Sequence, residues 1–390
     1  MTSALMPTYA RQPIAFEKGA GVWLYDTNGQ AYLDALTGIA VCGLGHAHPT
    51  VAQAIAEQAA TLVHTSNLYQ VPLQEALAQA LRQVSGMELC FFSNSGAEAN
   101  EAAIKLARLF GHKKEIAEPA IIVMENAFHG RTLATLSATG NKKVQIGFEP
   151  LVQGFVRVPF DDVVAVEQAI INNPNVAAIM VEPIQGEGGI RVPQNGFNYL
   201  VQLRQLCDKY DILLMLDEIQ TGNGRTGQYF AYQHTHIKPD VVTTAKGLGN
   251  GFPIGACLVQ GKASDLFKAG NHGSTYGGTP LACRAALTVV QLLQQGAIQN
   301  AASMGERMMQ GFKEKLQGLD VKVNGKGLMI GLQLPKPCAE LVAQARDQEH
   351  LLLNVTAENV VRLLPALVIT PKEVDEIVER VSRLIKSFLS

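Results

Sequence analysis

The sequence predicts an α/β protein in which a large, mainly parallel β-sheet carries helices on both faces. Short apolar runs recur between residues 89 and 244, and segments with helical periodicity separate most of them. The runs are apolar without alternation, which is typical of parallel strands that are covered on both faces. Hydrophobic residues make up 47% of the 390 residues, so the chain can bury a core of this size.

The first part of the chain predicts a β-hairpin followed by two helices. Residues 22–25 and 31–34 flank Asn28-Gly29, a dipeptide that favours the tight turn between antiparallel strands. Thr50 is a suitable N-cap for a helix that runs to about residue 63. A second amphipathic helix is expected over residues 73–84.

The central part alternates strands with helices. The expected strands are residues 89–92, 120–124, 155–158, 177–181, 212–216 and 241–244, and the clearest helices are 97–110, 163–171 and 197–210. Strands that alternate with helices form parallel sheets, because each helix returns the chain to the same edge.

The pattern changes after about residue 285. Two long helices (280–294 and 298–316), a strand pair (321–323 and 328–334), a further helix, a strand near 360–363 and a final helix from Pro371 are expected. Thr370 and Pro371 form a good helix start. We therefore expect residues 51–285 to form the large domain. Residues 1–50 and 286–390 are expected to form a smaller α+β domain.

Composition argues against several classes of protein. A net charge of −2 is not that of a protein that holds nucleic acid through its phosphates. No apolar run approaches the roughly 20 residues that span a bilayer, and the N-terminus lacks the apolar core of a signal peptide. The six scattered cysteines favour a reduced, cytoplasmic protein. The HxH pairs at 46–48 and 234–236 lack a clear third ligand, so no metal site is expected.

Three segments that follow predicted strands carry candidate chemistry, because ligands of open parallel sheets bind beyond the carboxyl ends of strands. Residues 93–100, SNSGAEAN, open a helix whose backbone N–H groups could hold a phosphate, although an ordinary helix cap is the alternative. Asp217 needs a partner, either a cationic ring nitrogen or an internal cap or ion pair. Lys246 could form a Schiff base if it is buried, and is otherwise an exposed loop lysine.

Glycine is concentrated in the same part of the chain. Between Gly186 and Gly278 lie 16 of the 36 glycines, which indicates that backbone approaches a ligand there. Residues 222–227, GNGRTG, fit the dinucleotide pattern GxGxxG. However, residues 217–221 separate them from the strand, and Asp240 begins the next strand instead of ending it, so NAD is not expected.

The chain resembles the class III (ornithine-type) aminotransferases, enzymes of fold type I that depend on pyridoxal 5′-phosphate (PLP). The resemblance rests on an ordered set of segments that covers nearly the whole chain: DTNGQAYLDALTGIAV, GLGHAHP, SGAEANEAAIKLAR, FHGRT, VEPIQGEGG, LDEIQTGNGRTG, AKGLGNGFPIGA, GSTYGGTPLAC and VVRLLPAL. Within the class, the match is closest to the acetylornithine aminotransferases. The resemblance implies PLP in the large domain, a homodimer with shared active sites and small-molecule substrates, without nucleic-acid or membrane partners. The scarcity of charge (17%) agrees with a broad apolar interface between subunits.

The resemblance also implies a cofactor site. Lys246 holds PLP covalently and, once substrate displaces it, becomes the base that moves the substrate proton. Asp217 pairs with the ring nitrogen and keeps the ring an electron sink. The other implied cofactor-binding residues are Phe128 and Ile219 on the two ring faces, Gln220 on the phenolic oxygen, Gly96 and Ala97 at the phosphate, Glu218, and Thr275 from the neighbouring subunit.

Substrate recognition is implied in the same way. Arg362 binds the α-carboxylate of glutamate, and Glu187 is a gate that pairs with this arginine while acetylornithine reacts. Arg131 and Ser274 match positions that contact acetylornithine, although Arg131 alone could be an exposed arginine at a helix start. The implied reaction is ping-pong transfer of the δ-amino group of N2-acetylornithine to 2-oxoglutarate, in arginine biosynthesis. Its products are glutamate and N-acetylglutamate 5-semialdehyde.

Alternatives to this reaction remain open. Succinylornithine, N-succinyl-diaminopimelate, ornithine and 4-aminobutyrate are other amine donors for the same chemistry. A protein that binds PLP without turnover is the alternative of another class, and intact Lys246, Asp217 and Arg362 argue against it.

Overall fold

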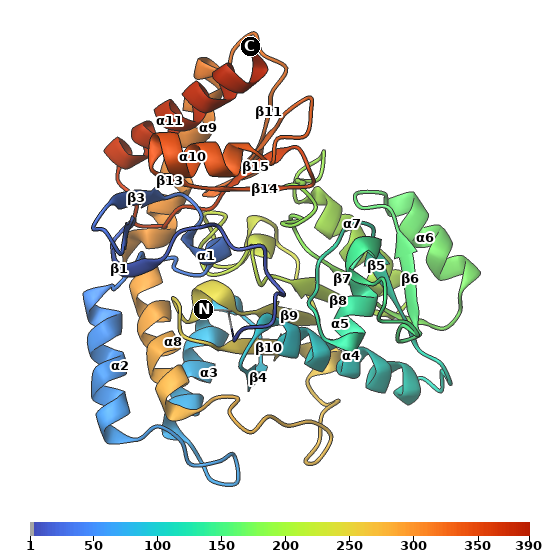
Figure 1. The fold of residues 1–390 in the computed structure, drawn as a ribbon. Coiled ribbons are helices and arrows are strands. Elements are labelled where there is room, and N and C mark those ends of the chain that lie inside the picture. Colours follow the sequence, from blue (N-terminus) through green and yellow to red (C-terminus); the bar gives the residue numbers. More distant parts are fainter. Residues whose placement is uncertain (1–3) are drawn as a thin grey trace.

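The computed structural model describes residues 4–390, and a seven-stranded sheet lies at its centre (Figure 1). The strand order is β4-β10-β9-β8-β7-β5-β6. The strands are β4 (Leu89–Ser93), β5 (Ala120–Met124), β6 (Phe155–Val158), β7 (Val176–Val181), β8 (Leu213–Asp217), β9 (Val241–Thr244) and β10 (Gly255–Val259). Neighbouring strands from β9 to β6 are parallel. The predicted α/β class with a mainly parallel sheet is therefore confirmed.

Strand β10 is the one strand of this sheet that the sequence did not predict. It is antiparallel to both of its neighbours, β9 and β4. Only the ten residues 245–254 join β9 to β10, and their only helix is a single short turn. A parallel crossover needs a dozen or more residues, so the chain turns back on itself here. Because the connection is rich in glycine, the sequence pattern predicts a loop there and does not indicate the strand that follows it.

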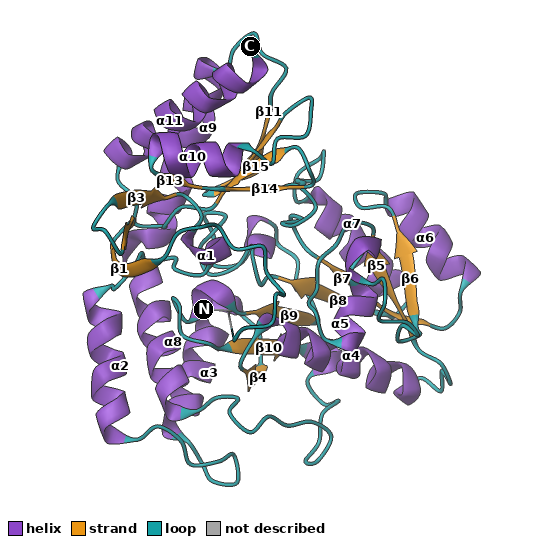
Figure 2. Ribbon diagram, viewed as in Figure 1, coloured by secondary structure: helices purple, strands orange, loops and turns teal. Residues whose placement is uncertain are grey.

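Helices cover both faces of the sheet (Figure 2). In β5, Ile121 and Val123 pack into the core beneath α4 (Gly96–Lys113). Ile122 and Met124 point to the opposite face, into the core that contains α6 (Val163–Asn172) and α7 (Asn198–Lys209). Successive side chains of a strand point to opposite faces, so a strand that is covered twice must be apolar throughout.

Three helices pack side by side at one end of the sheet, α2 (Pro49–Thr61), α3 (Pro72–Ser85) and α8 (Pro280–Leu292) (Figure 1). Each has proline in its first turn, where a missing N–H costs nothing. The N-cap of α2 is His48, so the predicted cap at Thr50 is wrong. Helix α8 continues through a π turn (Leu293–Ala297) into α9 (Ile298–Lys315). This stretch is apolar enough to cross a membrane by composition, and α8 buries its apolar residues against α2 and α3.

Two four-stranded sheets lie outside the central sheet. The first has the order β11 (Lys322–Lys326), β12 (Met329–Gln333), β15 (Val360–Leu363) and β14 (Asn354–Thr356), and α9, α10 (Leu341–Glu349) and α11 (Pro371–Leu389) pack beside it. The second has the order β1 (Phe16–Ala20), β2 (Trp23–Asp26), β3 (Ala31–Asp34) and β13 (Leu351–Leu352). The remaining elements are α1 (Thr37–Ala40), α5 (Leu133–Ala138) and the 3-10 turns Lys142–Val144, Ala231–His234, Lys246–Leu248 and Gly261–Ala263.

The pairing of β13 with β3 joins the N-terminal hairpin to the C-terminal third of the chain (Figure 1). We propose from this pairing that residues 1–50 and 286–390 form the small domain and residues 51–285 the large domain. Helix α11 begins at Pro371, directly after its N-cap Thr370, which confirms the predicted helix start. The Thr370 hydroxyl accepts a hydrogen bond from the N–H of Glu373.

Candidate active site

A cavity of about 460 Å³ lies beyond the carboxyl ends of the parallel strands. The segments that follow β4, β5, β7, β8 and β9 all contribute to its walls. Of the predicted site residues, the walls contain Gly96, Ala97, Phe128, Arg131, Asp217, Ile219, Gln220 and Lys246. The structure therefore brings together residues that lie as far as 150 positions apart at the edge where a parallel sheet binds ligands.

Lys246 follows β9 with its backbone in the left-handed region, at φ 45°. A lysine rarely adopts this conformation, and strained backbone of this kind is concentrated at functional sites. The side chain lines the cavity, and its amine makes no hydrogen bond or ion pair with any residue in the range 4–390. Burial lowers its pKa, which increases the neutral, nucleophilic fraction of the amine.

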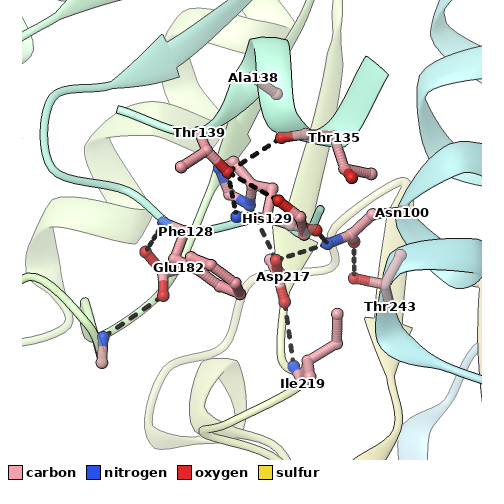
Figure 3. Close-up of polar contacts among 12 residues, drawn as sticks. Asn100, Phe128, His129, Thr135, Ala138, Thr139, Glu182, Asp217, Ile219 and Thr243 are labelled. Carbon is pink, nitrogen blue, oxygen red and sulfur yellow. Dashed lines mark hydrogen bonds and ion pairs between the residues drawn. The ribbon is translucent and has the colours of Figure 1, made fainter. Parts of the chain in front are cut away.

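Asp217 ends β8 with its carboxyl group held from behind (Figure 3). Oδ2 lies 2.8 Å from Nδ1 of His129 and accepts a hydrogen bond from Nδ2 of Asn100, also at 2.8 Å. Oδ1 accepts from the N–H of Ile219 at 3.1 Å. The internal ion pair that the sequence analysis left open is present. The same carboxyl group also lines the cavity, so a cationic ring nitrogen could reach it as well.

His129 and Asn100 are functional candidates that the sequence analysis missed. The His129 ring is buried, and its Nε2 has no partner among the described residues. Burial lowers its pKa, but the hydrogen bond and charge of Asp217 outweigh this, so the pKa is raised overall. Asn100 also donates to the carbonyl oxygen of His129, and Thr243 donates to the Asn100 amide oxygen. This network fixes the carboxyl group of Asp217 in one orientation.

The N-terminus of α4 opens into the same cavity. Ser95 caps the helix by accepting from the N–H of Glu98. The N–H groups of Gly96 and Ala97 have no acceptor among residues 4–390. A Cβ at Gly96 would lie 2.7 Å from Cδ1 of Ile219, so only glycine lets the helix start so close to the cavity wall. An 18-residue helix with free N–H groups is suited to an anion.

Phe128 and Ile219 line the cavity from the segments that follow two different strands, β5 and β8. Arg131 is exposed, and its guanidinium carbon lies 5.7 Å from the centroid of the Phe128 ring. It makes no ion pair with a described residue. The geometry leaves a positive charge free at the entrance to the cavity.

Arg362 on β15 brings a second positive charge to this region. Its side chain is fully buried, and Nη1 lies 2.5 Å from Oε1 of Glu187 and 3.5 Å from Oε1 of Gln220. Its Nε donates to Oδ1 of Asn354 at 3.0 Å, while Nη2 has no partner within the described chain. The Glu187 side chain is 35% exposed. The Glu187 carboxylate is therefore partly open to solvent, whereas the Arg362 guanidinium is enclosed.

Besides Glu187 and Arg362, three further predicted site residues do not line the cavity. Glu218 points away from it and accepts hydrogen bonds from the N–H groups of Ala231 and Tyr232. Ser274 touches the site indirectly, because its hydroxyl accepts from the side-chain amide of Asn94. Thr275 is exposed. Within one chain, it reaches none of the cavity-lining residues.

Comparison with known proteins agrees with this geometry. The model of the aminotransferase class-III family matches residues 5–385. The acetylornithine aminotransferase of Nitrosomonas europaea is 56% identical over 390 residues, which cover 99% of this chain and 98% of that protein.

Solved structures have the same fold. One structure of the ornithine aminotransferase from Toxoplasma gondii, with partial occupancy of PLP at its active site, has a TM-score of 0.94 at 32% identity. It covers 98% of this chain and 92% of that chain. The N-acetylornithine aminotransferase from Stenotrophomonas maltophilia has a TM-score of 0.83 at 36% identity, over 97% of each chain. Because the family model spans almost the whole sequence and the relatives match it end to end, the chain belongs to the class III aminotransferases, which use pyridoxal phosphate.

Proposed function

We propose that the protein transfers the δ-amino group of N2-acetylornithine to 2-oxoglutarate, with PLP in the cavity described above. The observation that carries this proposal is the pair of Arg362 and Glu187 beside Lys246. A fixed buried arginine can bind an α-carboxylate, and a movable carboxylate can neutralise it when the reacting amine comes from a side chain. The similarity to acetylornithine aminotransferases supports this choice of donor.

The residues that are present fit PLP. A buried amine without a partner faces the cavity, which suits a covalent bond to an aldehyde. The carboxyl group of Asp217 suits a cationic ring nitrogen, and the free N–H groups of Gly96 and Ala97 suit a phosphate. Phe128 and Ile219 would cover the two faces of the ring, and Gln220 would bind the ring oxygen.

Each residue then has a defined task. Bound PLP supplies an electron sink for the electron pair left on the carbon that bears the reacting amine. Lys246 would hold the cofactor between turnovers and, once released, its amine would act as the base that takes the proton from that carbon and passes it to the cofactor. Asp217 keeps a proton on the ring nitrogen, and His129 and Asn100 keep Asp217 in place. Arg131 and Ser274 are proposed to contact the acyl-amine donor.

A panel of amine donors tests the proposal. The single-turnover rate of each donor is followed through the absorbance of the bound cofactor. Acetylornithine is expected to give a higher kcat/KM than ornithine, succinylornithine, N-succinyl-diaminopimelate and 4-aminobutyrate. A higher kcat/KM for another donor would identify that donor as the substrate and leave the proposed amino-group transfer unchanged. No spectral change with any donor or with glutamate would favour a protein that binds PLP without turnover.

Arg362→Ala is expected to raise the KM for glutamate about 100-fold, because a fully buried, charge-assisted carboxylate partner is lost. In the proposed mode Arg362 pairs with Glu187 and does not bind acetylornithine, so the KM for acetylornithine should change less. Steady-state kinetics with each substrate measure both effects. Arg346→Ala, which removes a guanidinium that forms an ion pair with exposed Asp347 and a hydrogen bond with Gln12 outside the cavity wall, is the control. An unchanged KM for glutamate would show that another group holds its carboxylate.

We also propose that the protein is a homodimer in which Thr275 completes the phosphate site of the neighbouring subunit. Tyr276 is 63% exposed beside this threonine, and its ring lies 5.3 Å from that of His64. Leu68 and Tyr69 are also largely exposed, and the side-chain amide of Asn67 donates a hydrogen bond to the carbonyl oxygen of Ser274. Exposed apolar side chains gathered on two connected loops are typical of an interface between subunits.

Mixed dimers provide the test of a shared site. Lys246→Ala and Thr275→Asp chains, each inactive as homodimers, are expected to recover roughly a quarter of wild-type activity when mixed. Half of the dimers would then be hybrids with one intact site. Co-expression with two affinity tags isolates these hybrids. If Thr275 acts within its own chain, the hybrids contain no intact site and stay inactive.

We further propose a cytoplasmic location. All six cysteines of the chain are unpaired in the structure. Burial raises the thiol pKa of the five cysteines other than Cys42. Buried, inert thiols suit a reducing compartment, in which disulfides do not persist.

A further inference from the structure

Glu182 is a buried carboxyl group of the cavity wall that has no task in the reaction described so far. It follows β7 directly and is 5% exposed. It forms no ion pair with any residue from 4 to 390, and both of its oxygens accept hydrogen bonds from backbone N–H groups instead. Oε2 accepts from Phe128 at 3.1 Å and Oε1 from Gly186 at 3.3 Å (Figure 3). Burial raises its pKa to about 7.

The two N–H groups belong to segments with different tasks in the proposed reaction. Phe128 presents its ring to the cavity. Gly186 immediately precedes Glu187, which pairs with Arg362. These segments follow two different strands, β5 and β7, and the Glu182 side chain bonds to both of them. Its two hydrogen bonds therefore help to set how far apart the segments lie, together with the bond from Nε2 of Gln185 to the carbonyl oxygen of Glu125 at 2.7 Å.

The segment around Gly186 is held in place by other contacts as well as by its hydrogen bond to Glu182. Reciprocal backbone hydrogen bonds between Gln185 and Arg191, at 3.2 and 3.1 Å, close the loop at its base. A Cβ at Gly186 would lie 2.4 Å from Oε1 of Gln220, so the loop packs directly on a residue that also contacts Arg362. The hydrogen bond from Gly186 to Glu182 is the polar contact that joins the start of the loop to a side chain of the cavity wall.

We propose that Glu182 is a positioning residue that aligns the Phe128 ring and the Glu187 gate through their backbones. The inference rests on the proposed gate function of Glu187. A carboxyl group can accept both N–H groups at once, because each oxygen offers lone pairs to a different neighbour. If one hydrogen bond is lost, the ring cover and the gate are no longer held at one separation.

Glu182→Gln is the direct test. The amide has the same shape, but its NH₂ group must face one of the two backbone N–H groups, so one hydrogen bond is lost. Acetylornithine requires a closed gate and glutamate an open one. The ratio of kcat/KM for acetylornithine to kcat/KM for glutamate is therefore expected to fall about tenfold. The Kd for PLP, measured by quenching of protein fluorescence, is expected to rise about tenfold because the ring cover shifts.

A double-mutant cycle separates positioning from a general structural defect. In a Glu187→Gln background, Glu182→Gln should leave the substrate ratio unchanged and still weaken PLP binding. Asp26→Asn is the control for loss of a buried carboxylate charge, because Asp26 is 8% exposed, lies outside the cavity wall and accepts from the backbone N–H groups of Asn28 and Gln30, both through Oδ1. This control should alter neither the ratio nor the Kd. If Glu182→Gln does not fold, Glu182→Asp, which is too short to reach both N–H groups, replaces it.

Two results would overturn the inference. Equal losses for both substrates in Glu182→Gln would show a structural effect only. A fall in the ratio that persists in the Glu187→Gln background would show that Glu182 does not act through the gate. Failure of the wild-type protein to accept acetylornithine would instead refute the proposed substrate, and the ratio would then be measured with the donor that the wild-type protein prefers.

Discussion

Lys246→Ala is expected to lower kcat by about 10⁴-fold, the upper end of what a general base contributes, while PLP still binds. No other amine of the cavity wall can replace it, because Arg131 is a guanidinium and does not lose its proton. Steady-state turnover measures the loss, and equilibrium dialysis measures the PLP that remains. Borohydride reduction followed by peptide mass spectrometry should find cofactor on the Lys246 peptide of the wild type and on no peptide of the variant.

Lys268→Ala provides the control for Lys246→Ala. Its amine pairs with Asp265 on the surface, and both side chains are more than half exposed. Turnover and reductive labelling should both stay at wild-type values. Normal turnover in Lys246→Ala would refute the assignment of the base. Loss of PLP binding as well as turnover would mean that the covalent bond, and not the cavity wall, supplies most of the affinity.

Asp217→Asn is expected to lower kcat by about 10²- to 10³-fold, because the charge that would hold a proton on the ring nitrogen is removed. The amide also fits its surroundings poorly. His129, Asn100 and the N–H of Ile219 all approach this side chain, and an NH₂ group cannot accept from any of them. The measurements are kcat and the absorbance maximum of the bound cofactor, which reports the protonation of its ring.

Asp211→Asn is the control for this variant. Asp211 lies just before β8, at the opposite end of the strand from Asp217, and its side chain is 67% exposed beside Lys114 and Lys262. The absorbance maximum and kcat should not change in the control. An unchanged absorbance maximum in Asp217→Asn would identify another group as the partner of the ring nitrogen.

The sequence predicts the parts of this fold that are determined locally. The apolar runs of β5, β7 and β8 are readable because each strand is buried on both faces. Lys246 and Asp217 are readable as candidates because each follows such a strand. The sequence pattern does not predict strand β10, because a glycine-rich turn precedes it. It also misplaces the start of α2, because Pro49 begins the helix one residue before the expected cap at Thr50.

The residues that support the site depend on contacts between distant segments. His129 lies 88 positions before Asp217, and Glu182 lies 54 positions after Phe128. No pattern of period 2 or 3.6 encodes such pairs, so no periodicity of the sequence assigns their tasks. His129 lies in FHGRT and Glu182 in VEPIQGEGG, two of the segments that resemble the class III enzymes, but the resemblance implies no task for either residue. Their tasks become visible only when hydrogen bonds between strands are known.

The pairing of β13 with β3 has a consequence for how the chain is made. Leu33 lies beside Leu351, so the hairpin acquires its fourth strand only after the more than 300 residues between these positions have been synthesised. Contacts between such distant positions form slowly, because a long loop must close first. The two ends of the protein therefore depend on each other. Until β13 emerges from the ribosome, β3 keeps an unpaired edge that other nascent chains can bind.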